Sequence, residues 1–163
     1  MVNVGHSQGT FPSFQFASPP HILILEARFY DDINNMLIEG VIDALNASRT
    51  TFEIITVPGA LEIPSALQFL FSRKNGQAFD AAVVLGCVIR GETTHYEIVS
   101  NESARGIMDV ALKHNIVLGN GILTVENSGQ ALDRADKTRQ NKGGGAAIAA
   151  LSMLSLKQSC KGV

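Results

Sequence analysis

Cysteine is scarce in this sequence. The 163 residues include two, Cys87 within an apolar run and Cys160 near the C-terminus. Two cysteines are too few for a disulfide framework, and their spacing does not match that of zinc ligands. We therefore expect no metal site and a reducing compartment, the cytoplasm.

A strong excess of charge of one sign is also missing. The chain has 13 basic and 15 acidic residues, which gives a formal net charge of -2. This balance creates no overall field that would attract nucleic acid or an anionic membrane, so neither is an expected partner. Any anionic ligand must then be bound by a local cluster.

Long apolar runs are absent as well. No uninterrupted run approaches the roughly 18 residues of a membrane-spanning helix, and residues 1–20 lack the charged start and apolar block of a signal peptide. Residues 1–20 are instead rich in Gly, Ser, Gln and Pro, with Phe11, Phe14 and Phe16 as aromatic anchors. This composition is typical of a flexible arm, either disordered or packed on a neighbouring subunit.

Hydrophobic residues make up 45% of the chain, enough for one domain with a sizeable core. We place this domain at 21–158, followed by a short tail at 159–163. Short apolar runs alternate there with longer amphipathic ones, a pattern typical of a parallel sheet covered by helices. Strands are expected at 22–25, 52–57, 81–89 and 116–124, and helices from 31 or 32, from about 64, over about 96–114, after 127 or 128, and over about 141–156.

Local signals refine these elements. Asp31 or Asp32 is the expected cap of the first helix, and Asn127 or Ser128 that of the fourth. The unbroken apolarity of 81–89 predicts a strand buried on both faces. Within the fourth strand, Gly119-Asn120-Gly121 marks either a bulge or a close backbone approach.

Ligands of parallel sheets bind where the strands end, because the strand-to-helix loops gather there with helix N-termini. The three loops in question cover 27–30, 57–64 and 86–95. The third contains Gly91-Glu92-Thr93-Thr94-His95, in which backbone N–H groups and hydroxyls suit a phosphate and the imidazole suits proton transfer. The same string also fits an ordinary helix start with a surface histidine.

Several other residues in these regions allow two interpretations each. Glu62 is suited to binding a polyol, although we favour capping of the next helix. Phe29 is suited to stacking on a planar ring, although we favour a plug at the top of the core. Cys87, between apolar neighbours, is better read as a buried structural thiol than as a nucleophile.

The basic residues and glycines near the C-terminus also allow two interpretations. Arg134 and Lys142 flank a charged connection that a solvated helix face would also explain. Gly143-Gly144-Gly145 follows no strand, so close helix packing explains it better than a phosphate loop does.

Taken together, the loops resemble those of the lumazine synthase family, and the resemblance covers 21–158. The motifs that carry it occur in the family's order: Arg28-Phe29, Pro-Gly-Ala-Leu-Glu-Ile-Pro at 58–64, Gly-x-Val-Ile-Arg-Gly-x-Thr-Thr-His at 86–95, Thr124-x-Glu126-Asn127, and Arg134 with Asn141-Lys142-Gly143. The resemblance implies a flavodoxin-like, three-layer αβα sandwich around a four-stranded parallel sheet.

The same resemblance implies an enzyme of riboflavin biosynthesis without a metal or organic cofactor. It condenses 5-amino-6-(D-ribitylamino)uracil with 3,4-dihydroxy-2-butanone 4-phosphate to 6,7-dimethyl-8-ribityllumazine, the penultimate step. The resemblance also implies homopentamers with active sites between adjacent subunits. In some members the pentamers assemble further into decamers or 60-subunit shells. Riboflavin synthase is a possible partner. Because the connection at 136–140 is charged and lacks the glycine usual in shell-forming members, we favour free pentamers.

Residue roles follow by the same resemblance. His95 matches the general acid/base, Glu92 and Thr93 the backbone donors to the phosphate, and Arg134 the neighbouring subunit's phosphate partner. The residues that match the pyrimidine and ribityl subsite are Phe29, Ala60, Leu61, Glu62, Cys87, Val88, Ile89, Asn120 and Lys142. Tyr30 and Asn120 depart from the family's usual residues, which suggests a looser hold on the pyrimidine.

Two other functions compete with this interpretation. A flavin-binding or storage module would use the same site, but would need neither His95 nor Arg134. An electron carrier of the flavodoxin type would need a Ser/Thr/Gly-rich first turn, which residues 26–30 do not provide.

Overall fold

The computed structural model describes residues 12–160; Phe11 and the rest of the expected arm at 1–11, and the tail at 161–163, lie outside the described residues. The elements are, in chain order, β1 (His21–Ala27), α1 (Asp31–Ala47), β2 (Thr51–Val57), the 3-10 turn η1 (Ala60–Glu62), α2 (Ile63–Phe71), β3 (Ala81–Ile89), α3 (His95–Lys113), β4 (Leu118–Val125), α4 (Ser128–Ala135) and α5 (Lys142–Cys160). This order confirms the predicted alternation of strands and helices.

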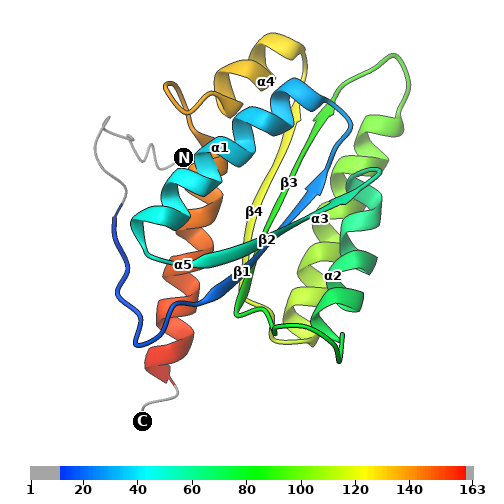
Figure 1. Cartoon of the computed structure of the whole chain (residues 1–163). Helices are drawn as coiled ribbons and strands as arrows, with labels where there is room; N and C mark the ends of the chain where they lie inside the picture. Colours follow the sequence, from blue (N-terminus) through cyan, green and yellow to red (C-terminus); the bar gives the residue numbers. More distant parts are fainter. Residues whose placement is uncertain (1–11, 161–163) are drawn as a thin grey trace.

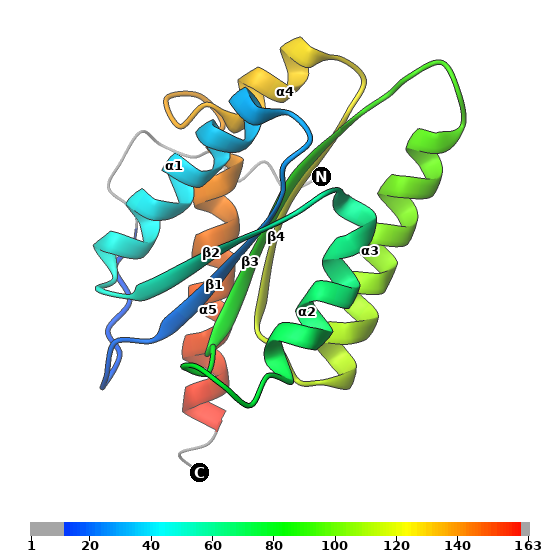
Figure 2. The same cartoon turned by 45° about the vertical axis from the view of Figure 1, so that its right-hand side comes forward.

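The four strands form one parallel sheet in the order β2-β1-β3-β4. Helices α1, α4 and α5 cover one face of the sheet, and α2 and α3 cover the other (Figures 1 and 2). The predicted three-layer αβα sandwich is confirmed, and the strand order is that of flavodoxin-like folds. As predicted, β3 is buried on both faces until its last two residues.

Alternation along β1 divides the core into two layers. Ile22 and Ile24 pack under α1 and α5, whereas Leu23 and Leu25 pack under α2 and α3. Each is fully buried, and burying such a side chain contributes about 1.5–3 kcal/mol to folding. Because β1 is packed on both faces, its carboxyl end is held rigidly between the two helix layers.

Glycines allow α5 to lie close to its neighbours. A Cβ at Gly119 would lie 2.0 Å from the carbonyl oxygen of Ala146, and one at Gly143 would lie 2.1 Å from that of Leu37. The pairing of β3 with β4 runs through Gly119-Asn120-Gly121 without a break. The alternative of a bulge is therefore wrong, and the alternative of a close backbone approach is confirmed.

Two helix starts differ in how they are capped. The N-cap of α1 is Tyr30, which makes no side-chain capping bond, so the expected cap at Asp31 or Asp32 is wrong. Both aspartates instead occupy the first turn, where their charge is favourable to the helix dipole. The N-cap of α4 is Asn127, whose Oδ1 accepts from the backbone N–H of Gln130 at 2.9 Å, as predicted.

The described part of the arm lies against its own chain. Phe14 and Phe16 pack beside the core layer under α1 and α5, and the backbone N–H of Phe14 donates to Oγ of Ser48 at 3.1 Å. At the other end, α5 continues to Cys160, four residues past the expected end at Leu156. None of the helices between residues 12 and 160 combines the length and apolar composition needed to cross a lipid bilayer.

Candidate functional site

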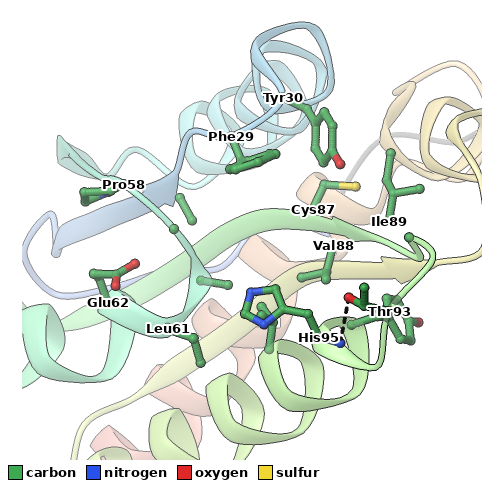
Figure 3. A pocket seen from close by; sticks show the side chains of 16 residues that line it. Phe29, Tyr30, Pro58, Leu61, Glu62, Cys87, Val88, Ile89, Thr93 and His95 are labelled. Atoms are coloured by element: carbon green, nitrogen blue, oxygen red, sulfur yellow. Dashed lines mark hydrogen bonds between the residues drawn. The ribbon is translucent and has the colours of Figure 1, made fainter.

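A cavity of about 450 Å³ opens where β1, β2 and β3 end, and we call it the strand-end cavity (Figure 3). In this strand order the connections from β1 and β3 leave to opposite faces of the sheet, which creates a crevice between the two strand ends. All three loops singled out in the sequence contribute. The lining residues are Ala27, Phe29, Tyr30, Pro58, Gly59, Ala60, Leu61, Glu62, Cys87, Val88, Ile89, Gly91, Thr93, His95, Tyr96 and Val99.

Phe29 forms one wall of this cavity. Its side chain is 70% exposed, so the predicted role as a plug of the core is wrong. It meets Tyr30 edge to face at 5.0 Å between ring centroids. The backbone N–H of Phe29 donates to the carbonyl of Ala27, which turns the chain sharply after β1. An exposed aromatic face is therefore presented to any planar group that enters.

The loop after β2 supplies a second wall. Ala60, Leu61 and Glu62 form η1, and Pro64 lies in the first turn of α2 as predicted. Glu62 is the N-cap of α2 but makes no side-chain capping bond, so the favoured capping role is wrong. Its carboxylate lines the cavity instead and offers acceptors for hydroxyl groups (Figure 3).

The end of β3 supplies the residues between these walls. Cys87 is buried, and Val88 and Ile89 are half-buried. Burial raises the pKa of the Cys87 thiol to about 11. The group stays protonated at neutral pH, and a thiol is a far poorer nucleophile than a thiolate. The favoured interpretation as a structural thiol therefore agrees with its surroundings.

The start of α3 brings a proton carrier to the same space. His95 is the first residue of the helix; its side chain is exposed and lines the cavity (Figure 3). Its backbone N–H donates to Oγ1 of Thr93 at 3.4 Å. Gly91 and Thr93 also line the cavity, while Glu92 is exposed on the loop between them. The positive end of the helix dipole thus adjoins a loop that can receive an anion.

A charged cluster that the sequence reasoning missed holds this loop. Arg90 donates to Glu97 on α3 and, at 2.7 Å, to Glu126 after β4. Its guanidinium also lies 4.1 Å from the ring centroid of Tyr96. The hydrogen bond with Glu97 raises the pKa of Arg90 and lowers that of the carboxylate. The motif at 86–95 contains Arg90, but the partners of Arg90 lie 7 and 36 residues away, so the motif alone does not reveal the cluster.

The remaining predicted residues lie elsewhere. Asn120, Arg134 and Lys142 line a second cavity of about 420 Å³ between β4, α4 and α5, which we call the β4–α5 cavity. Its other lining residues are Gly121, Ile122, Leu123, Thr124, Gln140, Asn141, Gly145, Ala146 and Ala149. Within one chain, the predicted site is thus split between two separate concave surfaces.

Polar groups of the β4–α5 cavity are held by short-range contacts. Nη1 of Arg134 donates to the carbonyl of Gln130 at 3.2 Å, and Oδ1 of Asn120 accepts from the backbone N–H of Ile122 at 3.0 Å. Lys142 is exposed at the start of α5. Between residues 12 and 160, no three His, Cys, Asp or Glu side chains gather closely enough to hold a metal ion.

Comparisons with known proteins agree with this geometry. The profile of the 6,7-dimethyl-8-ribityllumazine synthase family matches residues 19–158. Among similar proteins, the 6,7-dimethyl-8-ribityllumazine synthase of Sphingopyxis alaskensis is 59% identical over 138 residues, which cover 85% of this chain and 95% of that protein. 6,7-Dimethyl-8-ribityllumazine synthase 1 of Rhizobium meliloti is 54% identical over 86% of this chain and 93% of its own length. For the enzyme of Agrobacterium fabrum, the identity is 51% over 89% of this chain and 99% of that protein. The chain belongs to the 6,7-dimethyl-8-ribityllumazine synthase family.

Proposed function

We propose that this chain condenses 5-amino-6-(D-ribitylamino)uracil with 3,4-dihydroxy-2-butanone 4-phosphate to give 6,7-dimethyl-8-ribityllumazine. The observation that carries the proposal is the strand-end cavity, where an exposed aromatic ring and a histidine share one space. Family membership supplies the identity of the two substrates.

The pyrimidine substrate binds in the strand-end cavity. Its ring stacks on Phe29, and the backbones and side chains of 60–62 and 87–89 surround the ring and the start of the ribityl chain. Glu62 accepts hydrogen bonds from ribityl hydroxyls. The support is that these groups line one cavity and that the carboxylate is not used for helix capping.

His95 moves protons during the reaction. Attack of the substrate amine on the ketone gives an imine with loss of water, and phosphate leaves after a proton is removed from the carbon next to the imine. Ring closure and loss of water complete the lumazine. An imidazole exchanges protons readily near neutral pH, and holding two substrates together lowers the barrier further, by about 7–11 kcal/mol in well-oriented systems.

The phosphate binds between two subunits. Backbone N–H groups of Glu92 and Thr93 receive it at the start of α3, and Arg134 of an adjacent subunit pairs with it. Asn120 and Lys142 of that subunit close the pyrimidine and ribityl side. This assignment is supported by the division of the residues between two cavities of one chain.

A homopentamer completes the site in this proposal. We favour free pentamers over decamers or shells, because residues 136–140 carry charged side chains and no glycine. The free thiols Cys87 and Cys160 favour a cytoplasmic location. Riboflavin synthase, which consumes the product, is a candidate partner.

Formation of the fluorescent lumazine from the two substrates, compared with the reaction without protein, tests the activity. We expect a protein-dependent rate. Absence of any rate above background, together with tight binding of riboflavin, would contradict the proposal and favour a flavin-storage protein.

Mixing two impaired variants tests the shared site, with the butanone phosphate held below the KM of the Arg134→Ala variant. Subunits with His95→Ala and subunits with Arg134→Ala are unfolded together and refolded together. In a shared site, some positions combine an intact His95 with an intact Arg134 from the neighbour, and activity returns. No recovery in mixed particles of five times the 17.4 kDa chain mass would contradict the assignment.

A further inference from the structure

A carboxylate is buried behind the strand-end cavity. Glu26, the last residue but one of β1, is 2% exposed. Removing a carboxylate from water is costly unless charge and hydrogen bonds compensate for it. The hydrogen-bond partners of Glu26 must therefore compensate for its burial.

Three donors from different segments hold the carboxylate. Oε1 accepts from Nε of Arg28 at 3.1 Å and from Oγ1 of Thr56 at 2.8 Å, and Oε2 accepts from Nδ2 of Asn34 at 3.1 Å. The arginine side chain is 29% exposed and that of Glu26 is 3% exposed, so the ion pair reaches the surface through Arg28. Charge-assisted hydrogen bonds of this kind are about twice as strong as neutral ones.

The carboxylate also fixes the orientation of a buried amide. Asn34 is fully buried, and its Nδ2 is shared between Glu26 and the carbonyl of Ala27, at 3.1 Å to each. Within the described residues, its Oδ1 has no hydrogen-bond partner. Both hydrogen bonds of the Asn34 amide are thus donated by Nδ2 to residues of β1, and its acceptor oxygen makes none.

This network joins the segments that carry the cavity walls. Arg28 immediately precedes Phe29, and its Nη1 continues to Asp31 and Asn35 of α1. Thr56 lies two residues before Pro58, at the end of β2. The backbone N–H of Arg28 also donates to the carbonyl of Val57 at 3.2 Å. One carboxylate therefore links both loops to each other and to the first turn of α1.

Stability alone is a poor reason for this arrangement, because apolar residues of similar volume often replace a buried ion pair at no cost. We propose that Glu26 is a positioning residue for the pyrimidine substrate: it holds the loop at 28–30 and the end of β2 at the separation that the ring requires. The inference rests on the proposed function for the identity of this ligand.

Glu26→Gln is the primary test. A glutamine keeps the shape but offers one acceptor oxygen and one NH₂, so either the guanidinium of Arg28 or the amide of Asn34 loses its acceptor. We expect the KM for the pyrimidine to rise about tenfold, the scale of one charge-assisted hydrogen bond. The KM for the butanone phosphate should stay within about twofold, because the network does not touch the start of α3.

Glu53→Gln is the matched control. It makes the same replacement on β2 and breaks an ion pair with Arg73 at 3.0 Å, but Glu53 does not line either cavity. Both KM values should stay at the wild-type level. Equal changes in both variants, or equal rises of both KM values in Glu26→Gln, would show a general loss of stability and overturn the positioning role.

A second variant is available if Glu26→Gln does not fold. Thr56→Val removes a single donor while keeping the side-chain shape, and should raise the pyrimidine KM about threefold.

Calorimetric titration with the pyrimidine alone measures affinity without turnover. A wild-type protein that binds the pyrimidine but forms no lumazine would end the proposed function, while the affinity ratio still decides the role of Glu26. Unchanged pyrimidine affinity in folded Glu26→Gln, or no pyrimidine binding by the wild type, would overturn the inference.

Discussion

His95 of α3 and Phe29 of the β1–α1 loop face the same cavity from opposite sides (Figure 3). They are 66 positions apart in the chain, and they meet because β1 and β3 are paired neighbours whose helices leave to opposite faces of the sheet. The strand order itself thus gives one cavity both an exposed aromatic ring and a histidine.

Replacement of His95 should separate chemistry from folding. For His95→Ala we expect kcat to fall on the order of a hundredfold, the lower range for loss of a general acid/base, with unchanged thermal stability. Steady-state formation of lumazine measures the rate. His114→Ala, at the exposed end of α3, is the control and should keep full activity. Full activity in His95→Ala would exclude the proton-transfer role.

Replacement of Arg134 should affect one substrate. For Arg134→Ala we expect the KM for the butanone phosphate to rise about tenfold or more, because a hydrogen bond to a charged group is lost, while the KM for the pyrimidine stays near its wild-type value. Initial rates over both substrate concentrations provide the two constants. Arg139→Ala removes a nearby exposed arginine that pairs with Asp133 and Asp136, and should change neither KM. Parallel rises of both constants in Arg134→Ala would refute phosphate binding.

Close packing of α5 on β4 should make Gly119 intolerant of a side chain. In Gly119→Ala the new methyl group would overlap the carbonyl of Ala146, so α5 must move or the strand must bend. We expect a loss of about 3 kcal/mol in the free energy of unfolding, measured with urea. Gly91→Ala serves as control, since a Cβ there meets nothing within 4 Å. Equal stability of the two variants would contradict the close approach.

The raised pKa of Cys87 predicts a loss of stability in alkali. Its thiol has a pKa of about 11 in the folded chain, against an ordinary 9.0. Above pH 9 the unfolded chain therefore loses this proton first, and the free energy of unfolding decreases by about 2 kcal/mol between pH 9 and pH 11. Urea unfolding at several pH values measures the slope.

The measurement compares two variants that both carry Cys160→Ser. One retains Cys87 and the other also carries Cys87→Ala, so the difference between them reports on the Cys87 thiol. The alanine variant should lack that part of the slope. Identical pH dependence in the two proteins would mean that Cys87 ionises as readily in the folded chain as in the unfolded one.

The sequence predicted the features that follow from periodicity and from the order of the motifs. The buried run at 81–89 and the alternation of short apolar runs with longer amphipathic ones required helices on both faces of a sheet, and the loops at 27–30, 57–64 and 86–95 were placed at one edge of that sheet. The cavity at that edge follows from those placements. These signals are local, since each depends on residues within one element.

Other features depend on contacts that local patterns do not contain. The exposure of Phe29 results from the sharp turn after Ala27, and the cap of α1 at Tyr30 results from where the β1–α1 loop is held. Glu26 has the polar identity of a surface residue, yet it is buried, and its hydrogen-bond partners Asn34 and Thr56 lie 8 and 30 residues away. The division of the predicted site into two cavities likewise requires the packing of α5 beside β4.

The two cavities also occupy separate stretches of the chain. Every residue that lines the strand-end cavity lies between Ala27 and Val99, and every residue that lines the β4–α5 cavity lies between Asn120 and Ala149. A single genetic crossover between the codons for Val99 and Asn120 would therefore exchange one cavity whole and leave the other untouched.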